Sequence, residues 1–309
     1  MPRAHGALVV IAAALCLCAQ GCGSRAGAPQ FAQAMSEPAR PSATASALSA
    51  ATPPAPYEPP YPAHERGAKA FEPSVSLSGG RRFESREVGQ KPARKDLKVV
   101  ADYPVLLGDD RPAAREFNRR ARALVMGEVT SYLQDEPDPE KEKSPHWKDV
   151  EESHRVSHEI IFASDEVVSV LFYVTGYSWG AAHGYHYPLT LNFDLKAGRE
   201  LELTQLFKPR SGYLRIIARL CAEDLNRQFE HQFGQKHHFG EGSTWAEGLK
   251  PKRDNYKSWV ITRDGPVFIF EEYQVVAYAD GEPKVLIPFD SLKEIINPRG
   301  ALAGLHARE

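Results

Sequence analysis

The densest group of side chains with potential chemistry lies in residues Gly176–Leu195, where histidines and large aromatics alternate with glycines. His183 and His186 are three residues apart, a spacing that would place two metal ligands on one face of a helix. The surrounding glycines and Pro188 instead indicate a loop, and no third ligand follows at a telling spacing. We therefore expect no metal and no cofactor, and we expect His183 to fix the loop by hydrogen bonding.

The aromatic residues of this stretch offer a second kind of chemistry. Tyr177, Trp179 and Tyr185, together with His183 and His186, form the candidate ligand-binding set. Exposed aromatic rings between glycines are a common way to stack on sugars or to anchor a protein partner. The alternative is that these rings cover the sheet edge and the core. The glycines themselves indicate backbone positions that side chains would obstruct.

No catalytic residue is assigned from the sequence. A hydrolase that uses His183 or His186 is an alternative, but no nucleophile-elbow motif is present. Cys221 is the only cysteine of the expected folded region, which excludes an internal disulfide or a multi-cysteine zinc site there. Its helical spacing with Ile217 and Leu225 predicts a small apolar core residue rather than a reactive thiol.

The N-terminus has the parts of an export signal. Residues Met1–Gly21 comprise a short start with Arg3 and an apolar run, Ala7–Ala19, which is short for a membrane span. The small residues before Cys22 resemble a bacterial lipobox, so we expect cleavage there and a lipid anchor on Cys22 that holds the chain at a membrane. Gly23 after the cysteine favours the outer membrane in a cell with two membranes. A plain signal peptide, with Cys22 incidental, is the alternative.

Composition divides the rest of the chain. Residues 22–94 are expected to form the anchor and a disordered tether, because prolines, alanines and serines replace large aliphatic residues. Residues 95–297 are expected to fold, with a division into about 95–195 and 196–297 as a second interpretation, and residues 298–309 are a tail. The formal net charge of −2 gives no basis for nucleic-acid binding.

Hydrophobic periodicity within 95–297 predicts strands and two long helices. One helix should begin at Pro112, and the other should be capped by Ser211. A short helix should open with a capping box at Ser291–Glu294. Runs joined by tight turns must pair antiparallel, so the fold class is α+β, an antiparallel sheet with helices packed on one face. The expected strands cover residues 96–107, 156–162, 167–174, 189–195, 200–203, 259–262, 267–270, 273–279 and 284–289.

Several motifs together resemble one family. They are Gly180–Gly184, Phe193–Arg199, Glu202–Phe207, Asp264-Gly265, Tyr273 with Ala277–Gly281, and Leu286–Phe289. In this order they resemble the extracytoplasmic domain of RsiV-type anti-sigma proteins, which also occurs in some peptidoglycan deacetylases. The resemblance covers roughly residues 95–296.

The resemblance implies an α+β module outside the cytoplasm, which in the RsiV type binds lysozyme. Few residues precede the apolar run, so an anti-sigma role is not expected, and no deacetylase domain is recognisable. The sequence thus favours a binding module over an enzyme. The expected partner is cell-wall glycan (peptidoglycan) or a secreted wall-degrading enzyme such as lysozyme. A structural envelope lipoprotein without a small ligand is the alternative.

Overall fold

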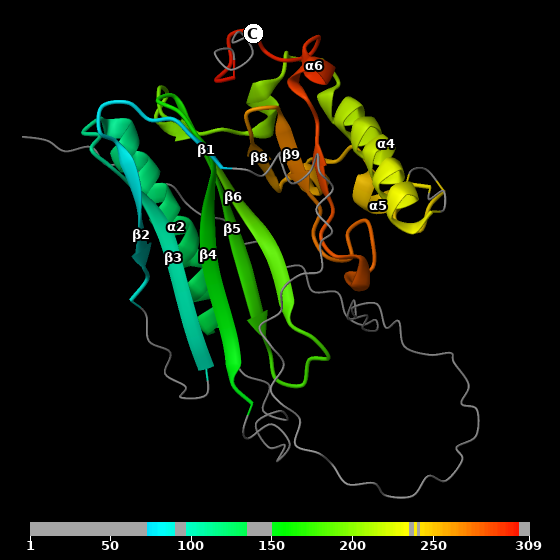
Figure 1. Ribbon diagram of the computed structural model, residues 1–309, viewed down its shortest axis with the longest axis horizontal. Coiled ribbons are helices and arrows are strands. Elements are labelled where there is room, and N and C mark those ends of the chain that lie inside the picture. Colours follow the sequence, from blue (N-terminus) through cyan, green and yellow to red (C-terminus); the bar gives the residue numbers. More distant parts are fainter. Residues whose placement is uncertain (1–72, 90–96, 135–149, 235–237, 240–241, 303–309) are drawn as a thin grey trace, which may run out of the picture. The chain divides into compact units, whose positions relative to one another are not determined.

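The computed structural model describes residues 73–89, 97–134, 150–234, 238–239 and 242–302 (Figure 1). The chain divides into two units, Met1–Pro56 and Tyr57–Glu309, and every described residue belongs to the second. The export signal, Cys22 and most of the predicted tether lie outside the described residues. None of the helices in the described ranges is long and apolar enough to cross a membrane.

A seven-stranded sheet forms the larger layer, in the order β2-β3-β4-β5-β6-β7, with β1 pairing with β4. The β4–β5 and β5–β6 pairs are antiparallel, whereas β3 and β4 are parallel. A parallel pair needs a crossover, and helix α2 supplies it. The predicted α+β class is therefore confirmed, and the large sheet is mostly antiparallel. The strands are β1 Ser74–Val75, β2 Arg82–Glu87, β3 Leu97–Leu107, β4 Glu152–Ala163, β5 Val167–Tyr177, β6 Tyr185–Asp194 and β7 Arg199–Glu200.

Helix α2 (Pro112–Gln134) covers one face of this sheet. It begins at Pro112, as predicted, because proline lacks the N–H that the first turn cannot use. One stripe of small and large apolar side chains at spacings of three or four residues is fully buried against the strands: Ala114, Phe117, Ala121, Val125 and Val129. Phe117 contacts Phe193 of β6 edge-on, with ring centroids 5.6 Å apart.

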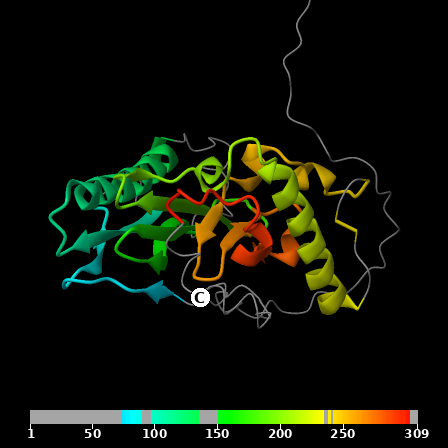
Figure 2. The same cartoon turned by 90° about the horizontal axis from the view of Figure 1, so that it is seen from above.

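A second, three-stranded sheet lies on the other face of the large one. It consists of β8 Trp259–Ile261, β9 Pro266–Ile269 and β10 Lys284–Leu286, in the order β10-β9-β8. Successive side chains of a strand point to opposite faces. Val260 accordingly packs with Leu171 of the large sheet, whereas Trp259 and Ile261 pack in the cluster that contains helix α4, Tyr213–Phe233. Figure 2 shows the two sheets between α2 and α4.

Buried polar groups join the two sheets. The Ser169 hydroxyl donates to the Asn192 side-chain oxygen at 2.6 Å, and the Asn192 amide donates to the Trp259 carbonyl at 2.8 Å. The Ile261 N–H donates to the Ser169 hydroxyl at 2.8 Å. Both polar side chains are almost fully buried, so their hydrogen bonds offset a desolvation cost of ~1–3 kcal/mol for each group.

The folded part extends beyond the predicted boundaries of 95 and 297. Strand β2 pairs antiparallel with β3, although it lies in the range that we predicted as tether. Phe83 is the one large apolar residue of β2, and it is partly buried. The pairing is therefore determined by the edge of β3 and not by an apolar pattern within β2. Leu302, which lies in the range that we predicted as tail, is buried in the core around α4. The internal division near residue 195 stays a prediction.

Three local predictions are wrong. The expected strand at 273–279 is a turn followed by the 3-10 helix η4 (Tyr278–Asp280), because Tyr273 has φ 60° and the adjacent Val275 and Val276 are both buried. Ser211 does not cap α4, since the left-handed Gly212 occupies that position without a side-chain cap. The last helix, α6, runs from Phe289 to Leu292 and starts before the predicted box at Ser291. The remaining short elements are η2 Leu203–Leu206, α5 Ala246–Leu249 and η3 Arg253–Tyr256.

Candidate functional site

Two segments about 90 residues apart in the chain meet beside the β5–β6 loop. The His183 ring stacks on the Tyr278 ring, with centroids 3.7 Å apart and planes at 23°. The Tyr273 hydroxyl lies 3.4 Å from His183 Nε2, and the Tyr278 hydroxyl donates to the Gly184 carbonyl at 3.3 Å. We call the three rings of His183, Tyr273 and Tyr278 the aromatic platform. His183 is exposed, and Tyr273 keeps 53% of its surface exposed.

Two neighbouring groups determine which ring nitrogen of neutral His183 is the donor. Its Nδ1 lies 2.7 Å from the Gly184 carbonyl oxygen, which can only accept, so Nδ1 carries the proton. In the neutral imidazole Nε2 then accepts, and the Tyr273 hydroxyl is the donor that faces it. The predicted loop-fixing role of His183 is therefore confirmed, and the same ring also holds Tyr273 and Tyr278.

The glycines of this stretch allow the close approach of the strands. A Cβ on Gly176 would lie 2.4 Å from the Ser153 carbonyl oxygen and 2.3 Å from the Tyr185 hydroxyl. A Cβ on Gly184 would lie 2.8 Å from the Gly176 carbonyl oxygen. Gly180 has φ 74°, which favours glycine because it has no Cβ. The loop that presents His183 therefore depends on these positions.

His186 lies behind the platform, on the face of β6 toward the small sheet. Its Nδ1 contacts the Glu272 carboxylate, and its ring centroid lies 6.2 Å from that of Tyr278. Burial is the main cause that lowers the pKa of His186, aided by the charge of Lys284, and burial also raises the pKa of Glu272. Both shifts favour the neutral forms of the two side chains. This pair supports the segment that carries Tyr273.

The other predicted site residues lie elsewhere. The Tyr177 hydroxyl donates to the Ala181 carbonyl at 3.0 Å and closes the loop, and the Trp179 indole N–H donates to the Val150 carbonyl at 2.5 Å. Tyr185 points to the α2 face, opposite to its neighbour His186. The structure thus brings His183 and His186 together around Tyr278 and separates them from Tyr185. Ligand contact by these residues stays a prediction.

Tyr185 takes part in a buried network that the sequence did not indicate. Its hydroxyl lies 2.8 Å from Nδ1 of His154, a side chain of β4 whose residue is 1% exposed. The Tyr132 ring of α2 stacks on His154 at 4.0 Å, and Glu128 of α2 lies 3.6 Å from His154 Nε2. Burial lowers the pKa of His154 to about 4, so the imidazole is neutral at pH 7. The network holds α2 on the sheet.

The prediction for Cys221 can be compared with the structure. Cys221 is fully buried in the core around α4, as predicted, and burial raises the pKa of its thiol. Within the described ranges, no three His, Cys, Asp or Glu side chains are grouped so that they could hold a metal ion.

Tyr273, Tyr278 and Glu272 are site residues that the sequence reasoning did not select. An apparent alternation of apolar residues across 273–279 predicted a strand, and a strand gave no reason to select these residues for a site. The useful signal was the segment Ala277–Gly281, which contributed to the family resemblance and places Tyr278 at the start of η4.

Comparison with known proteins shows that part of the chain is similar to a family of unknown function. A family model described as "Protein of unknown function (DUF3298)" matches residues 204–290, which include Tyr273 and Tyr278. Peptidoglycan-N-acetylmuramic acid deacetylase PdaC of Bacillus subtilis (strain 168) is 26% identical over 202 residues, which are 65% of this chain and 39% of PdaC. The chain therefore spans about two fifths of the length of this curated relative. The resemblance to a peptidoglycan deacetylase is confirmed, and the RsiV-type part stays a prediction.

Solved structures support the same fold. A DUF3298 family member from Bacteroides fragilis NCTC 9343 covers 75% of this chain and 99% of its own, with 17% sequence identity and a TM-score of 0.55. A second DUF3298 protein, from Pseudomonas aeruginosa PAO1, covers 74% of this chain and 97% of its own at 15% identity, and its TM-score is 0.43. The first likeness shows a shared fold, and the second is too distant to add to it.

Proposed function

We propose that this protein is an envelope-tethered, non-catalytic module that binds cell-wall glycan through the aromatic platform. The observation that carries the proposal is the exposed Tyr273 ring beside the stacked pair of His183 and Tyr278. The Tyr273 and Tyr278 ring centroids lie 6.0 Å apart with planes at 29°, so the two tyrosines present adjacent aromatic surfaces.

The chemistry of the platform suits a sugar polymer. Aromatic rings supply rigid apolar area at little entropic cost, and their hydroxyl groups supply polar contacts at the edge. The hydrogen bonds of Tyr278 to Gly184 and of Tyr273 to His183 fix the rings before a ligand arrives, which lowers the entropic cost of binding.

The comparison with PdaC favours glycan over protein as the ligand. That relative is named for its action on N-acetylmuramic acid in peptidoglycan, and this chain is similar to part of it. A domain of this kind beside a deacetylase would hold the wall polymer while another part acts on it. In the present chain, the lipid on Cys22 and the tether would keep the module near the wall.

The test is co-sedimentation of the full chain with purified insoluble peptidoglycan. Tyr273→Ala and Tyr278→Ala should each reduce retention about tenfold or more, since a stacked aromatic anchor contributes ~2 kcal/mol or more when truncated. Phe233→Ala is the matched control: Phe233 is an exposed aromatic (43%) on α4 whose ring packs against Phe229, and its loss should leave retention unchanged.

Two results would overturn the proposal. One is wild-type protein that stays in the supernatant with peptidoglycan. The other is equal retention of the wild type and both tyrosine variants. If the chain instead captures lysozyme and ignores peptidoglycan, its ligand is a protein and the glycan assignment is wrong.

A further inference from the structure

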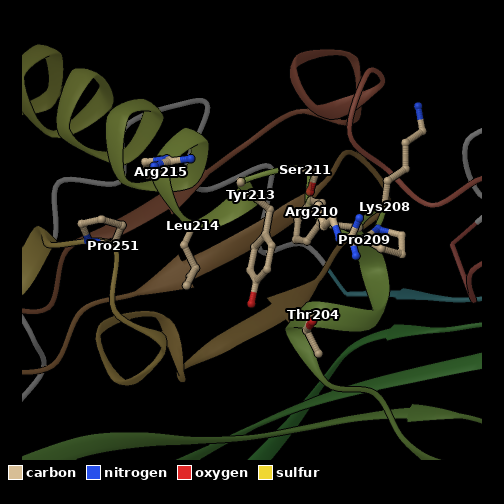
Figure 3. A pocket seen from close by; sticks show the side chains of 11 residues that line it. Thr204, Lys208, Pro209, Arg210, Ser211, Tyr213, Leu214, Arg215 and Pro251 are labelled. Atoms are coloured by element: carbon tan, nitrogen blue, oxygen red, sulfur yellow. The ribbon is translucent and has the colours of Figure 1, made fainter.

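A separate pocket of about 510 Å³ opens at the N-terminal end of α4 (Figure 3). Its floor includes the Tyr213 ring, which stacks on Phe207 at 4.8 Å with planes at 10°. Lys208, Arg210 and Arg215 also line it, and in Figure 3 Arg215 lies on one side of Tyr213 and the other two lie on the opposite side. The residues that line this pocket include no acidic side chain.

The cations of this pocket lack neutralising partners. Within the described residues, no ion pair joins Lys208, Arg210 or Arg215 to a carboxylate, whereas Arg219, one turn further along α4, pairs with Glu223 at 2.7 Å. Lys208 Nζ donates to the Glu294 backbone carbonyl at 2.7 Å, which leaves two of its three protons for a ligand. The pocket is therefore a concentration of positive charge on a chain whose net charge is −2.

The start of α4 adds to this positive field. No acidic residue occupies the first turn and no side chain caps it, so the first N–H groups have no side-chain acceptor. Arg215 instead lies over this end, with a guanidinium nitrogen 3.4 Å from the Cβ position of Gly212. In addition, Ser211 lines the pocket, and its hydroxyl oxygen is buried without a hydrogen-bond partner among the described residues. An unpaired buried hydroxyl costs stability unless a ligand satisfies it.

The loop that forms the pocket is fixed from both sides. The Lys208 N–H donates to the Ile295 carbonyl at 2.7 Å, and Phe207 forms a β-bridge with Ile296. The Ser211 N–H donates to the Lys208 carbonyl at 3.2 Å. The cations are thus carried by a backbone that is already ordered, so a ligand need not order the loop.

We propose that this pocket binds a phosphate group. A phosphate oxyanion accepts from guanidinium forks, from a hydroxyl and from the N–H groups of a helix start, and the residues that line this pocket supply all three kinds of donor. The stacked Tyr213 and Phe207 rings would pack against the carbon skeleton that carries the phosphate. This site is distinct from the aromatic platform and does not depend on the glycan proposal.

The first test probes the site with inorganic phosphate. In the full chain, phosphate should slow the modification of Arg210 and Arg215 by phenylglyoxal, as read by mass spectrometry. The modification rate of Arg219 is the internal control and should stay unchanged. Equal protection of all three arginines, or protection of none, would overturn the proposal.

The second test removes the charge and identifies the source of the phosphate. The double variant Arg210→Asn/Arg215→Gln keeps a residue that tolerates the positive φ of position 210. It should weaken, about tenfold, the protection by phosphate of the neighbouring Lys208 against an amine-selective reagent. The matched control is Arg219→Gln/Arg227→Gln, which removes the same amount of charge from α4 outside the pocket and should leave the protection unchanged.

Vesicles of phosphatidylcholine, with and without phosphatidylglycerol, form the other arm, with acylation at position 22 prevented by Cys22→Ala. Retention only on anionic vesicles, and its loss in the double variant alone, assigns a lipid headgroup as the source. Phosphate protection without vesicle binding assigns a soluble or polymer-borne phosphate. Equal behaviour of the double variant and its control in both arms would show that the pocket binds no phosphate.

Discussion

Adding one methyl group to a glycine should change stability in opposite directions at two positions of this fold. Gly176 lies in β5, where a Cβ would come within 2.4 Å of the Ser153 carbonyl oxygen and 2.3 Å of the Tyr185 hydroxyl. Gly127 lies on the exposed side of α2, where a Cβ would meet nothing within 4 Å. Both substitutions add the same methyl group, so the difference between their effects on stability reports how closely the surrounding atoms pack at each position.

The magnitude follows from which atoms can move. The Tyr185 hydroxyl could swing away, but only by giving up its 2.8 Å contact with His154, and the Ser153 oxygen is backbone inside β4. Both routes are costly, so Gly176→Ala should destabilise the fold by ~1–3 kcal/mol. Gly127→Ala should stabilise it by ~0.5–1 kcal/mol, because glycine in a helix interior is unfavourable relative to alanine.

Thermal unfolding followed by circular dichroism is the assay, with urea unfolding as a second measure. For a domain of this size ~1 kcal/mol corresponds to ~2–4 °C, so the two variants should shift Tm to opposite sides of the wild type. If Gly176→Ala is as stable as the wild type while Gly127→Ala behaves as expected, the close packing of β4, β5 and Tyr185 is wrong.

Four further predictions concern single side chains. Tyr273→Gly should raise the free energy of unfolding by about 1 kcal/mol in urea titrations, because glycine adopts the left-handed backbone at φ 60° without strain. The same variant should abolish peptidoglycan retention. A loss of stability would contradict this prediction. His154 has a folded pKa of about 4, below its ordinary value of 6.5, so the folded state binds fewer protons and loses about 3 kcal/mol as pH falls from 6.5 to 4; His154→Gln should remove this dependence. Burial raises the pKa of Glu282 to about 7, so its contribution is present below pH 4.5 and is lost as pH rises through 7, and Glu282→Gln should therefore gain on the wild type toward pH 8 in the same titrations. Cys221 should react with a thiol reagent only after unfolding, and fast labelling of the native chain would contradict its burial.

Regular periodicity explains which parts of the fold could be predicted. The helix at Pro112 and the strand at Leu189–Phe193 bury one face over several residues, so local pattern and tertiary environment agree. Strand β2 has no such pattern, because its pairing comes from β3 alone. Ser211 has the type of a cap, yet Gly212 in the left-handed conformation starts the helix, and side-chain type does not reveal backbone conformation.

Only the part of the candidate site that lies in the β5–β6 loop could be predicted from the sequence. The histidines and glycines of the β5–β6 loop are local features, and their loop-fixing role follows from their types and spacing. Tyr273 contacts His183 across 90 positions of the chain, and that contact exists only because the small sheet lies on the large one. No local pattern encodes such a contact. The opposite directions of Tyr185 and His186 follow from strand geometry, once the loop is known to end at Gly184.

The hydrogen bonds that join Ser169, Asn192 and the β8 backbone fix the position of one sheet relative to the other. Apolar faces alone would tolerate small sliding movements, because their attraction is not directional. Any slip here would leave an amide, a hydroxyl and two backbone groups unpaired in a dry interior. His183 lies in the loop between β5 and β6 of the large sheet, whereas Tyr273 and Tyr278 follow β9 of the small sheet. The same hydrogen bonds therefore determine the distances between the rings of the aromatic platform. Asn192→Leu should therefore loosen the aromatic platform, whose residues Asn192 does not contact.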